Sequence, residues 1–209
     1  MKNLAVFVSG SGSNLQAIID AIDRGFIKAG LALVVSDNEK AYALERARKN
    51  NIDTFCFNPK KYKNRSAYEN LIMAELSKRK IDFIALAGFM RILSPEFVAE
   101  YKNRIVNIHP ALLPSFPGQR ALKDALNYGV KYTGVTVHFV DEGVDSGPII
   151  MQDIEPIKNG DREDRLLERI HKIEHRLYPE AIKLLVEGRL IIEGRRVIVK
   201  EGKSEDKKD

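Results

Sequence analysis

The sequence predicts an α/β fold in which a mostly parallel sheet carries helices on both faces. Short apolar runs without helical periodicity alternate with amphipathic stretches from residue 3 onwards, and the connections between them are short. Such alternation is typical of parallel strands joined by crossover helices. Two further apolar runs, at residues 133–140 and 148–157, are separated only by an acidic turn. They predict antiparallel strands at one end of a Rossmann-like sheet.

Each element has its own signal in the chain. The expected strands are residues 3–8, 31–36, 54–57, 82–87, 104–108, 133–140 and 148–157. Apolar residues at helical spacing predict helices at residues 15–22, 42–49, 67–80 and 119–129, and a long amphipathic C-terminal helix at 162–187. Ser94 and Pro95 predict the start of a further short helix. Residues 190–199 predict a hairpin around Glu193 and Gly194.

The composition indicates a single globular domain over residues 1–200. The chain has 209 residues, of which 44% are hydrophobic and 30% are charged, as is ordinary for a globular protein. Residues 201–209 are almost all charged, so we expect a disordered tail there. Residues 1–10 resemble a signal peptide superficially, but their apolar run is short and passes into a glycine-rich turn. We therefore read them as a first strand.

Charge and cysteine content narrow the classes of function. Cys56 is the one cysteine, so no internal disulfide can form, and we expect a cytoplasmic protein with this thiol buried and inert. No stretch approaches the roughly 18 apolar residues of a membrane span. The net charge of +5 is spread among acidic residues, which favours small anionic substrates over nucleic acid.

A turn of small residues joins the first expected strand to the first helix. Residues 9–14 read Ser-Gly-Ser-Gly-Ser-Asn. Small residues let backbone N–H groups approach a ligand, and a helix N-terminus favours an anion, so the turn indicates a phosphate site. Ser13 or Asn14 is the expected helix N-cap. The alternative is a tight turn that binds nothing, since the ending of a P-loop is absent and only the front half of a dinucleotide fingerprint is present.

The strand at residues 104–108 runs into a loop rich in proline. Pro110, Pro114 and Pro117 remove backbone donors, so the chain must leave the sheet near His109. Asn107 and His109 are two residues apart and point the same way if both are extended. An amide and an imidazole at the carboxyl end of a strand are candidate donors to a developing oxyanion. The alternative is an edge strand with a buried, satisfied Asn and His.

Three other features leave alternatives open. A carboxylate at Asp145 would raise the pKa of His109 if the two met, but they are 36 positions apart, and a turn aspartate is the simpler interpretation. His171, Glu174 and His175 match an H-x-x-E-H zinc pattern, although no third ligand is evident. His138 lies among β-branched residues and is expected to face the core or its edge.

Four motifs together resemble one enzyme family. They are Ser9-Gly-Ser-Gly-Ser-Asn-Leu-Gln-Ala, Ala87-Gly-Phe-Met-Arg-Ile-Leu, Asn107-Ile-His-Pro-Ala-Leu-Leu-Pro-Ser-Phe-Pro-Gly and Asp145-Ser-Gly-Pro-Ile-Ile. In this order and spacing they resemble the phosphoribosylglycinamide formyltransferases, folate-dependent enzymes of purine biosynthesis, from about residue 2 to residue 190. The basic hairpin and the charged tail match nothing that this resemblance assigns.

The resemblance implies a reaction and a set of site residues. It implies formyl transfer from the cosubstrate 10-formyltetrahydrofolate to the amine of glycinamide ribonucleotide (GAR), without a metal. The implied catalytic residues are Asn107, protonated His109 and Asp145, which would raise the pKa of His109 and relay a proton. The residues implied to bind GAR are Gly12, Ser13, Asn14 and Glu174. Those implied to bind folate are Arg65, Met90, Arg91, Ile92, Leu93, Asn107, Val140, Asp141 and Asp145.

The resemblance also changes the other interpretations. It implies that the match of His171, Glu174 and His175 to a zinc pattern is a coincidence, because Glu174 is implied to bind the substrate. Methionyl-tRNA formyltransferase and formyltetrahydrofolate deformylase share the Asn-x-His…Asp core, but each carries a further domain for which we expect no room here. A folate hydrolase on this scaffold and a nucleotide- or nucleic-acid-binding module remain the alternative functions. We expect small-molecule partners, with no nucleic acid and no membrane, and a monomer or a homodimer.

Overall fold

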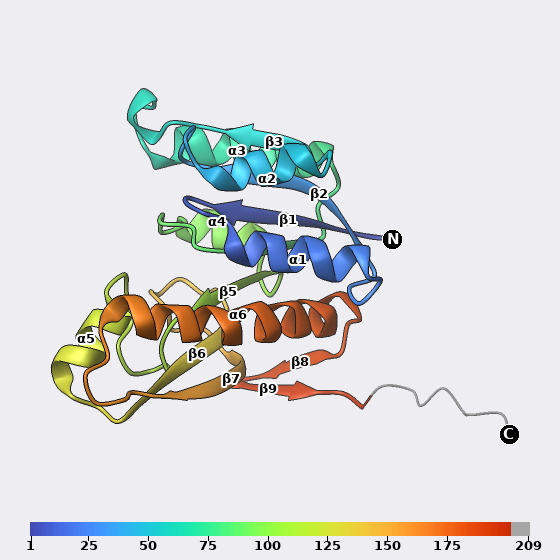
Figure 1. Cartoon of the computed structure of the whole chain (residues 1–209). Helices are drawn as coiled ribbons and strands as arrows, with labels where there is room; N and C mark the ends of the chain where they lie inside the picture. Colours follow the sequence, from blue (N-terminus) through green and yellow to red (C-terminus); the bar gives the residue numbers. More distant parts are fainter. Residues whose placement is uncertain (202–209) are drawn as a thin grey trace, which may run out of the picture.

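The computed structural model describes residues 1–201, and within them nine strands form one sheet (Figure 1). The strand order is β3-β2-β1-β4-β5-β6-β7-β9-β8. This confirms the α/β class, with a mostly parallel sheet and antiparallel strands at one end. The expected disordered tail lies, from residue 202 on, outside the described residues. None of the helices in residues 1–201 combines the length and apolar character needed to cross a bilayer.

The strands fall close to the ranges that the sequence predicts. Their bounds are β1 Lys2–Val8, β2 Ala29–Ser36, β3 Thr54–Cys56, β4 Phe83–Leu86, β5 Ile105–His109, β6 Tyr132–Phe139, β7 Ile149–Pro156, β8 Leu190–Glu193 and β9 Arg196–Val199. The helices are α1 Ser13–Asp23, α2 Tyr42–Lys49, α3 Arg65–Lys78, α4 Pro95–Glu100, α5 Ala121–Tyr128 and α6 Glu163–Val186, with a short 3₁₀ turn η1 at Pro59–Lys61. Ser94 caps α4 by accepting a hydrogen bond from the Phe97 N–H, as expected.

The direction of chain progression across the sheet reverses beside β1. Strands β1 to β5 are parallel, and β1 pairs with β2 on one side and with β4 on the other. Strand β6 then adds antiparallel to β5, and β7 adds antiparallel to β6. At such a reversal the loops leave the carboxyl ends of β1 and β4 in opposite directions, which opens a crevice between them.

Both faces of the sheet are covered by helices. In β1, Leu4, Val6 and Val8 join the core that α1, α2 and α6 cover, whereas Ala5 and Phe7 join the core that α3 and α4 cover. All five side chains are fully buried. Burial on both faces explains why β1 is apolar without alternation. Figure 1 shows α1 and α6 lying alongside each other over one face.

The C-terminal segment extends the sheet beyond the antiparallel pair. The hairpin of β8 and β9 forms where Glu193 and Gly194 predict it, and β9 joins β7 through the pair Ile149 and Arg196. Cys56 is half-buried, so the expectation of a fully buried thiol is wrong. It lies on β3, which is the edge strand and has a neighbour on one side only.

Helix α6 is tied to the centre of the sheet by one tyrosine. Tyr178 is completely buried, and its hydroxyl lies 2.8 Å from Leu86 O and 3.1 Å from Val106 O. These carbonyl groups belong to β4 and β5, so one O–H group joins two neighbouring strands to the helix. Glu174 lies one turn earlier on α6, and this anchor therefore also positions a cavity residue.

We predict that Tyr178→Phe lowers the free energy of unfolding by about 0.5–1.5 kcal/mol, because it removes the buried hydroxyl that hydrogen-bonds to β4 and β5. Urea unfolding monitored by circular dichroism measures this difference. Tyr132→Phe is the matched control, since Tyr132 is 59% exposed, and should change stability by less than about 0.5 kcal/mol. Equal stabilities of the two variants would contradict the anchoring role.

Candidate functional site

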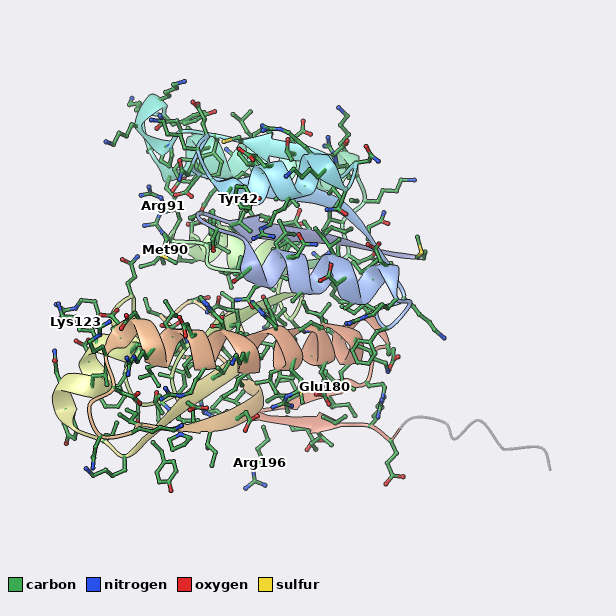
Figure 2. All side chains as sticks on the ribbon, viewed as in Figure 1. Tyr42, Met90, Arg91, Lys123, Glu180 and Arg196 are labelled. Atoms are coloured by element: carbon green, nitrogen blue, oxygen red, sulfur yellow. The ribbon has the colours of Figure 1, made fainter. Side chains whose placement is uncertain are left out.

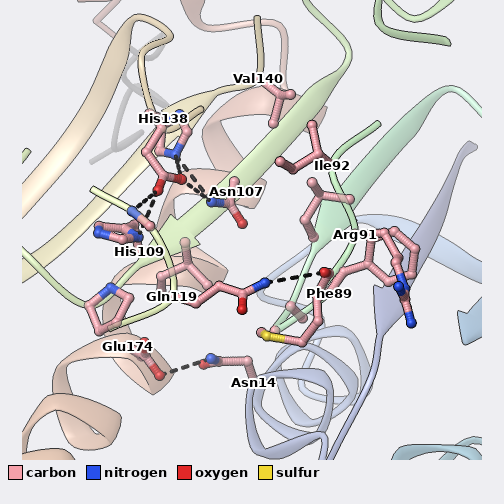
Figure 3. Close-up of a pocket in the computed structure, with 18 of the residues that line it drawn as sticks. Asn14, Phe89, Arg91, Ile92, Asn107, His109, Gln119, His138, Val140 and Glu174 are labelled. Carbon is pink, nitrogen blue, oxygen red and sulfur yellow. Dashed lines mark hydrogen bonds and ion pairs between the residues drawn. The ribbon is translucent and has the colours of Figure 1, made fainter. Parts of the chain in front are cut away.

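A cavity of about 530 Å³ opens where the order of the strands reverses (Figure 3). Its walls come from the loop after β1, the loop after β4, the end of β5, the loop after β6 and one face of α6. The lining includes residues 10–14, 86–93, 107–110, 118–119, 140–141 and 143–145, together with Val98, His138, Leu167, His171 and Glu174. All the implied catalytic and GAR-binding residues therefore lie in one cavity.

The turn after β1 approaches α2 so closely that only glycine fits. Gly12 has a φ of 72°, and a Cβ atom at this position would lie 2.6 Å from the Cβ of Ala43. Helix α1 begins at Ser13 with Gly12 as its N-cap residue, so the expectation that Ser13 or Asn14 caps the helix is wrong. The side chain of Asn14 is turned towards α6 instead. The backbone of the turn lines the cavity at the positive end of the α1 dipole.

Asn14 and Glu174 form a buried polar pair on the floor of the cavity. Asn14 Nδ2 donates to Glu174 Oε2 at 2.9 Å, and both residues are at most 9% exposed (Figure 3). Burial raises the pKa of Glu174 to about 7, although the hydrogen bond from Asn14 acts in the opposite direction. Asn14 Oδ1 is buried and has no hydrogen-bond partner among the described residues. The pair can therefore accept hydrogen bonds from a ligand.

Asn107, His109 and Asp145 converge at the end of β5. Asp145 Oδ2 lies 3.4 Å from His109 Nδ1, and Asn107 Nδ2 donates to Asp145 Oδ1 at 3.4 Å. Asp145 also accepts a hydrogen bond of 2.8 Å from the Gly118 N–H. The loop after β6 starts beside Ile105, at the beginning of β5, and folds back along the strand until Asp145 reaches its end. The tertiary structure thus brings together residues whose sequence spacing leaves them unconnected.

The ionisation of His109 differs from the sequence expectation. Burial lowers the pKa of this imidazole below its usual value, and the His138 ring acts in the same direction. The Phe116 carbonyl, 2.9 Å from Nε2, and the Asp145 carboxylate oppose this shift but do not overcome it. Asp145 therefore acts on the pKa of His109 in the expected direction, but burial, which leaves only 5% of the residue exposed to water, outweighs it.

Asp145 is held in its ionised form by its neighbours. Burial by itself would raise its pKa, but the hydrogen bond from the Gly118 N–H and the charge of the His109 ring act against burial, and the pKa lies below the usual value. The backbone of Asp145 has a φ of 53°, which is uncommon for a residue other than glycine. Arg195 on the C-terminal hairpin donates to the adjacent Ser146 carbonyl oxygen at 2.7 Å. The hairpin therefore supports the loop that carries this carboxylate.

The loop after β4 forms an apolar wall on the other side of the cavity. Met90 and Ile92 are more than half exposed, whereas Leu93 is buried. The Ser9 hydroxyl accepts a hydrogen bond of 2.9 Å from the Met90 N–H, and Arg91 Nε donates to Asp37 at 2.7 Å. Figure 2 shows Met90 and Arg91 on one side of the molecule, between the part covered by α2 and the part covered by α6. Val140 and Asp141 line the cavity from the loop after β6.

Arg65 is the one implied binding residue that does not line the cavity. It is the first residue of α3. Burial raises the pKa of Tyr68, and the charges of Arg65 and Arg91 both oppose this shift, so both guanidinium groups lie near the same phenol. Arg65 is therefore close to the Arg91 end of the wall without touching the cavity. Its role in folate binding stays a prediction.

His138 and Gln119 are site residues that sequence reasoning misses. His138 is a buried strand residue, as expected, but its Nε2 lies 3.2 Å from Asn107 Nδ2. Gln119 Nε2 donates to Met90 O at 3.4 Å and so reaches the opposite wall (Figure 3). Neither residue belongs to a chemical motif. The signal that could identify His138 is its cross-strand pairing with Asn107, and this requires the strand register.

The H-x-x-E-H pattern does not converge as metal ligands would. The rings of His171 and His175 stack with centroids 5.9 Å apart, while Glu174 is turned to Asn14. Within residues 1–201, no group of three or more His, Cys, Asp or Glu side chains is arranged to hold a metal ion. The pattern instead marks one face of α6, from which His171 and Glu174 reach the cavity.

Comparisons of the sequence and of the structure with known proteins all find formyltransferases. The model of the formyl transferase family matches residues 2–182. The chain is 45% identical to phosphoribosylglycinamide formyltransferase of Bacillus subtilis (strain 168) over 89% of this chain and 95% of that protein. The Escherichia coli (strain K12) protein of the same name is 43% identical over 90% and 89%. Glycinamide ribonucleotide transformylase 1 from Symbiobacterium toebii matches in structure with a TM-score of 0.94 at 47% identity, over 96% and 95% of the two chains.

We predict that Glu174→Gln stabilises the ligand-free protein increasingly as the pH rises from about 5 to about 8. The folded-state pKa of about 7 lies above the ordinary glutamate pKa of 4.5. The unfolded chain therefore loses this proton first, and in the wild type the folded state loses relative stability as the pH rises between these values. Glutamine has no proton to lose. Urea titrations of both proteins at several pH values measure the difference, and parallel profiles would contradict the assignment.

Proposed function

Because this chain belongs to the phosphoribosylglycinamide formyltransferase family, we propose that it transfers a formyl group from 10-formyltetrahydrofolate to the amine of GAR, in purine biosynthesis. The products are formyl-GAR and tetrahydrofolate. The observation that carries the proposal is the meeting of Asn107, His109 and Asp145 in one cavity between a helix N-terminus and an apolar wall. Cys56 as the single cysteine supports a cytoplasmic setting for the reaction.

The half of the cavity next to α1 is assigned to GAR. The backbone of Gly12, Ser13 and Asn14 would hold the phosphate, since N–H groups and a helix dipole favour an anion at this point. Glu174 and the unpartnered Asn14 Oδ1 would accept hydrogen bonds from the polar N–H or O–H groups of the same substrate. This arrangement would aim the substrate amine at the end of β5.

The other half of the cavity is assigned to the folate. An aromatic pterin requires apolar walls with a few polar groups, which this half offers. The proposed contacts are Met90, Arg91, Ile92, Leu93, Asn107, Val140, Asp141 and Asp145. Arg65 would act from outside the cavity on the carboxylate end of the ligand, because it shares the neighbourhood of Tyr68 with Arg91.

The proposed reaction is a direct transfer through a tetrahedral intermediate. The GAR amine attacks the formyl carbon, a C–N bond forms, and the carbonyl oxygen becomes an oxyanion. Asn107 and His109 would stabilise this charge with hydrogen bonds. The bond from the formyl carbon to N10 of the folate then breaks, and the proton lost by the amine passes to N10 with the help of Asp145, either directly or through water. The lowered pKa of His109 implies that it must gain a proton, or act as a neutral donor, once the ligands have bound.

A transfer assay separates this proposal from its nearest alternative. We expect purified protein and 10-formyltetrahydrofolate to yield tetrahydrofolate only when GAR is added, as followed spectroscopically. Equal release of tetrahydrofolate without GAR would identify a hydrolase on the same scaffold. No release under either condition would contradict the formyl-transfer function itself.

We predict that Asp145→Asn lowers kcat by about 10²–10⁴-fold, the usual range for a group that assists proton transfer, while KM for GAR changes little. The variant removes the charge facing His109 and keeps the size of the side chain. Glu142→Gln is the matched control, because this exposed carboxylate lies in the same loop but does not line the cavity. Unchanged turnover in Asp145→Asn, or an equal loss in the control, would exclude the assigned role.

A further inference from the structure

His138 contacts Asn107 and Asp145, two of the residues assigned to catalysis, and is almost completely buried. It is 2% exposed and pairs directly with Asn107 across the antiparallel strands β5 and β6. Its Nε2 lies 3.2 Å from Asn107 Nδ2 and 3.7 Å from Asp145 Oδ1. Its Nδ1 lies 2.7 Å from the Phe139 carbonyl oxygen. One ring therefore touches two of the three residues assigned to catalysis.

These contacts determine where the ring carries its proton. A carbonyl oxygen can only accept, so Nδ1 must be the protonated nitrogen of the neutral ring. Nε2 is then an acceptor, and it requires a donor from Asn107. Asp145 Oδ1, on the same side, is an acceptor as well. The NH₂ end of the Asn107 amide must therefore face His138 and Asp145 (Figure 3). One N–H is held by His138 Nε2, and the other, whose contact with Asp145 is long at 3.4 Å, is the one that can turn to the developing oxyanion.

The orientation of this amide matters because its two ends are similar in size and opposite in hydrogen-bonding character. A half-turn of the amide would place oxygen where nitrogen now lies, and no N–H group of Asn107 would then be available to the oxyanion beside Asp145. The contact with Asp145 is longer, at 3.4 Å, and comes from a loop. The contact with His138 comes from the neighbouring strand of the sheet and is therefore the more rigid of the two.

We propose that His138 is a positioning residue, whose Nε2 lone pair holds the Asn107 amide, and with it the Asp145 carboxylate, in the arrangement that formyl transfer requires. It acts through Asn107 and not on the substrate. This inference rests on the proposed function for its kinetic consequence. The tautomer of His138 and the orientation of Asn107 are testable without any reaction.

The kinetic test compares two substitutions. In His138→Gln the Oε1 atom can replace Nε2 as an acceptor, whereas His138→Leu fills the space without one. We expect His138→Leu to lower kcat by about 10–100-fold, at or below the usual loss of one oxyanion-hole donor, with KM for GAR within about threefold. His138→Gln should restore most of that loss. Wild-type kcat in His138→Leu, or no restoration by His138→Gln when both variants fold, would overturn the proposal.

A spectroscopic test examines the tautomer of His138 directly. It requires no activity measurement and uses the wild-type protein, so it holds even if a variant fails to fold. In the ¹⁵N NMR spectrum of the ligand-free, full-length wild type at pH 7, Nδ1 of His138 should have a protonated, pyrrole-type shift, and Nε2 an unprotonated, pyridine-type shift. The opposite tautomer would overturn the proposal. The expected shifts combined with an inactive wild type would instead contradict formyl transfer and leave the positioning contact intact.

Discussion

The reversal of strand order between β1 and β4 is the constraint on which the rest of the structure depends. Parallel strands on either side of this point send their loops in opposite directions, so the carboxyl edge cannot close there. The glycine turn, the apolar wall and the end of β5 all meet at this opening. Tyr178 then joins α6 to β4 and β5, and this brings the face of the helix that carries His171 and Glu174 to the same place.

The cavity collects buried polar groups whose hydrogen-bonding capacity residues 1–201 do not fill. Asn14 Oδ1 has no donor among those residues, and Glu174 is buried enough to raise its pKa to about 7. Such groups cost stability, and a folded protein keeps few of them without a reason. Under the proposed function, polar groups of GAR would satisfy both. The stability that these groups cost the free protein then contributes to selectivity, because a ligand without hydrogen-bond donors at these positions would not recover it.

The residues around β5 show how burial and charge compete at short range. His109 and Asp145 are neighbours, yet burial moves the pKa of His109 downwards despite the carboxylate. Asp145 remains below its usual pKa because several donors converge on it. An argument from the ion pair alone therefore gives the direction in which Asp145 moves the pKa of His109, but not the direction of the net shift. The result depends on how much water reaches the ring, and that is a property of the packed loops around residues 116–118.

The elements, their order and the chemistry available at the ends of the strands can be predicted from the amino-acid sequence. Apolar runs, helical periodicity and prolines are local signals, which is why β1, α6 and the departure of the chain after His109 are predictable. The folded chain is needed to see that Asp145 meets His109, that His138 contacts Asn107, and that Gly12 rather than Ser13 or Asn14 caps α1. These outcomes depend on strand register and on contacts between distant segments, and no local pattern in a single chain encodes them.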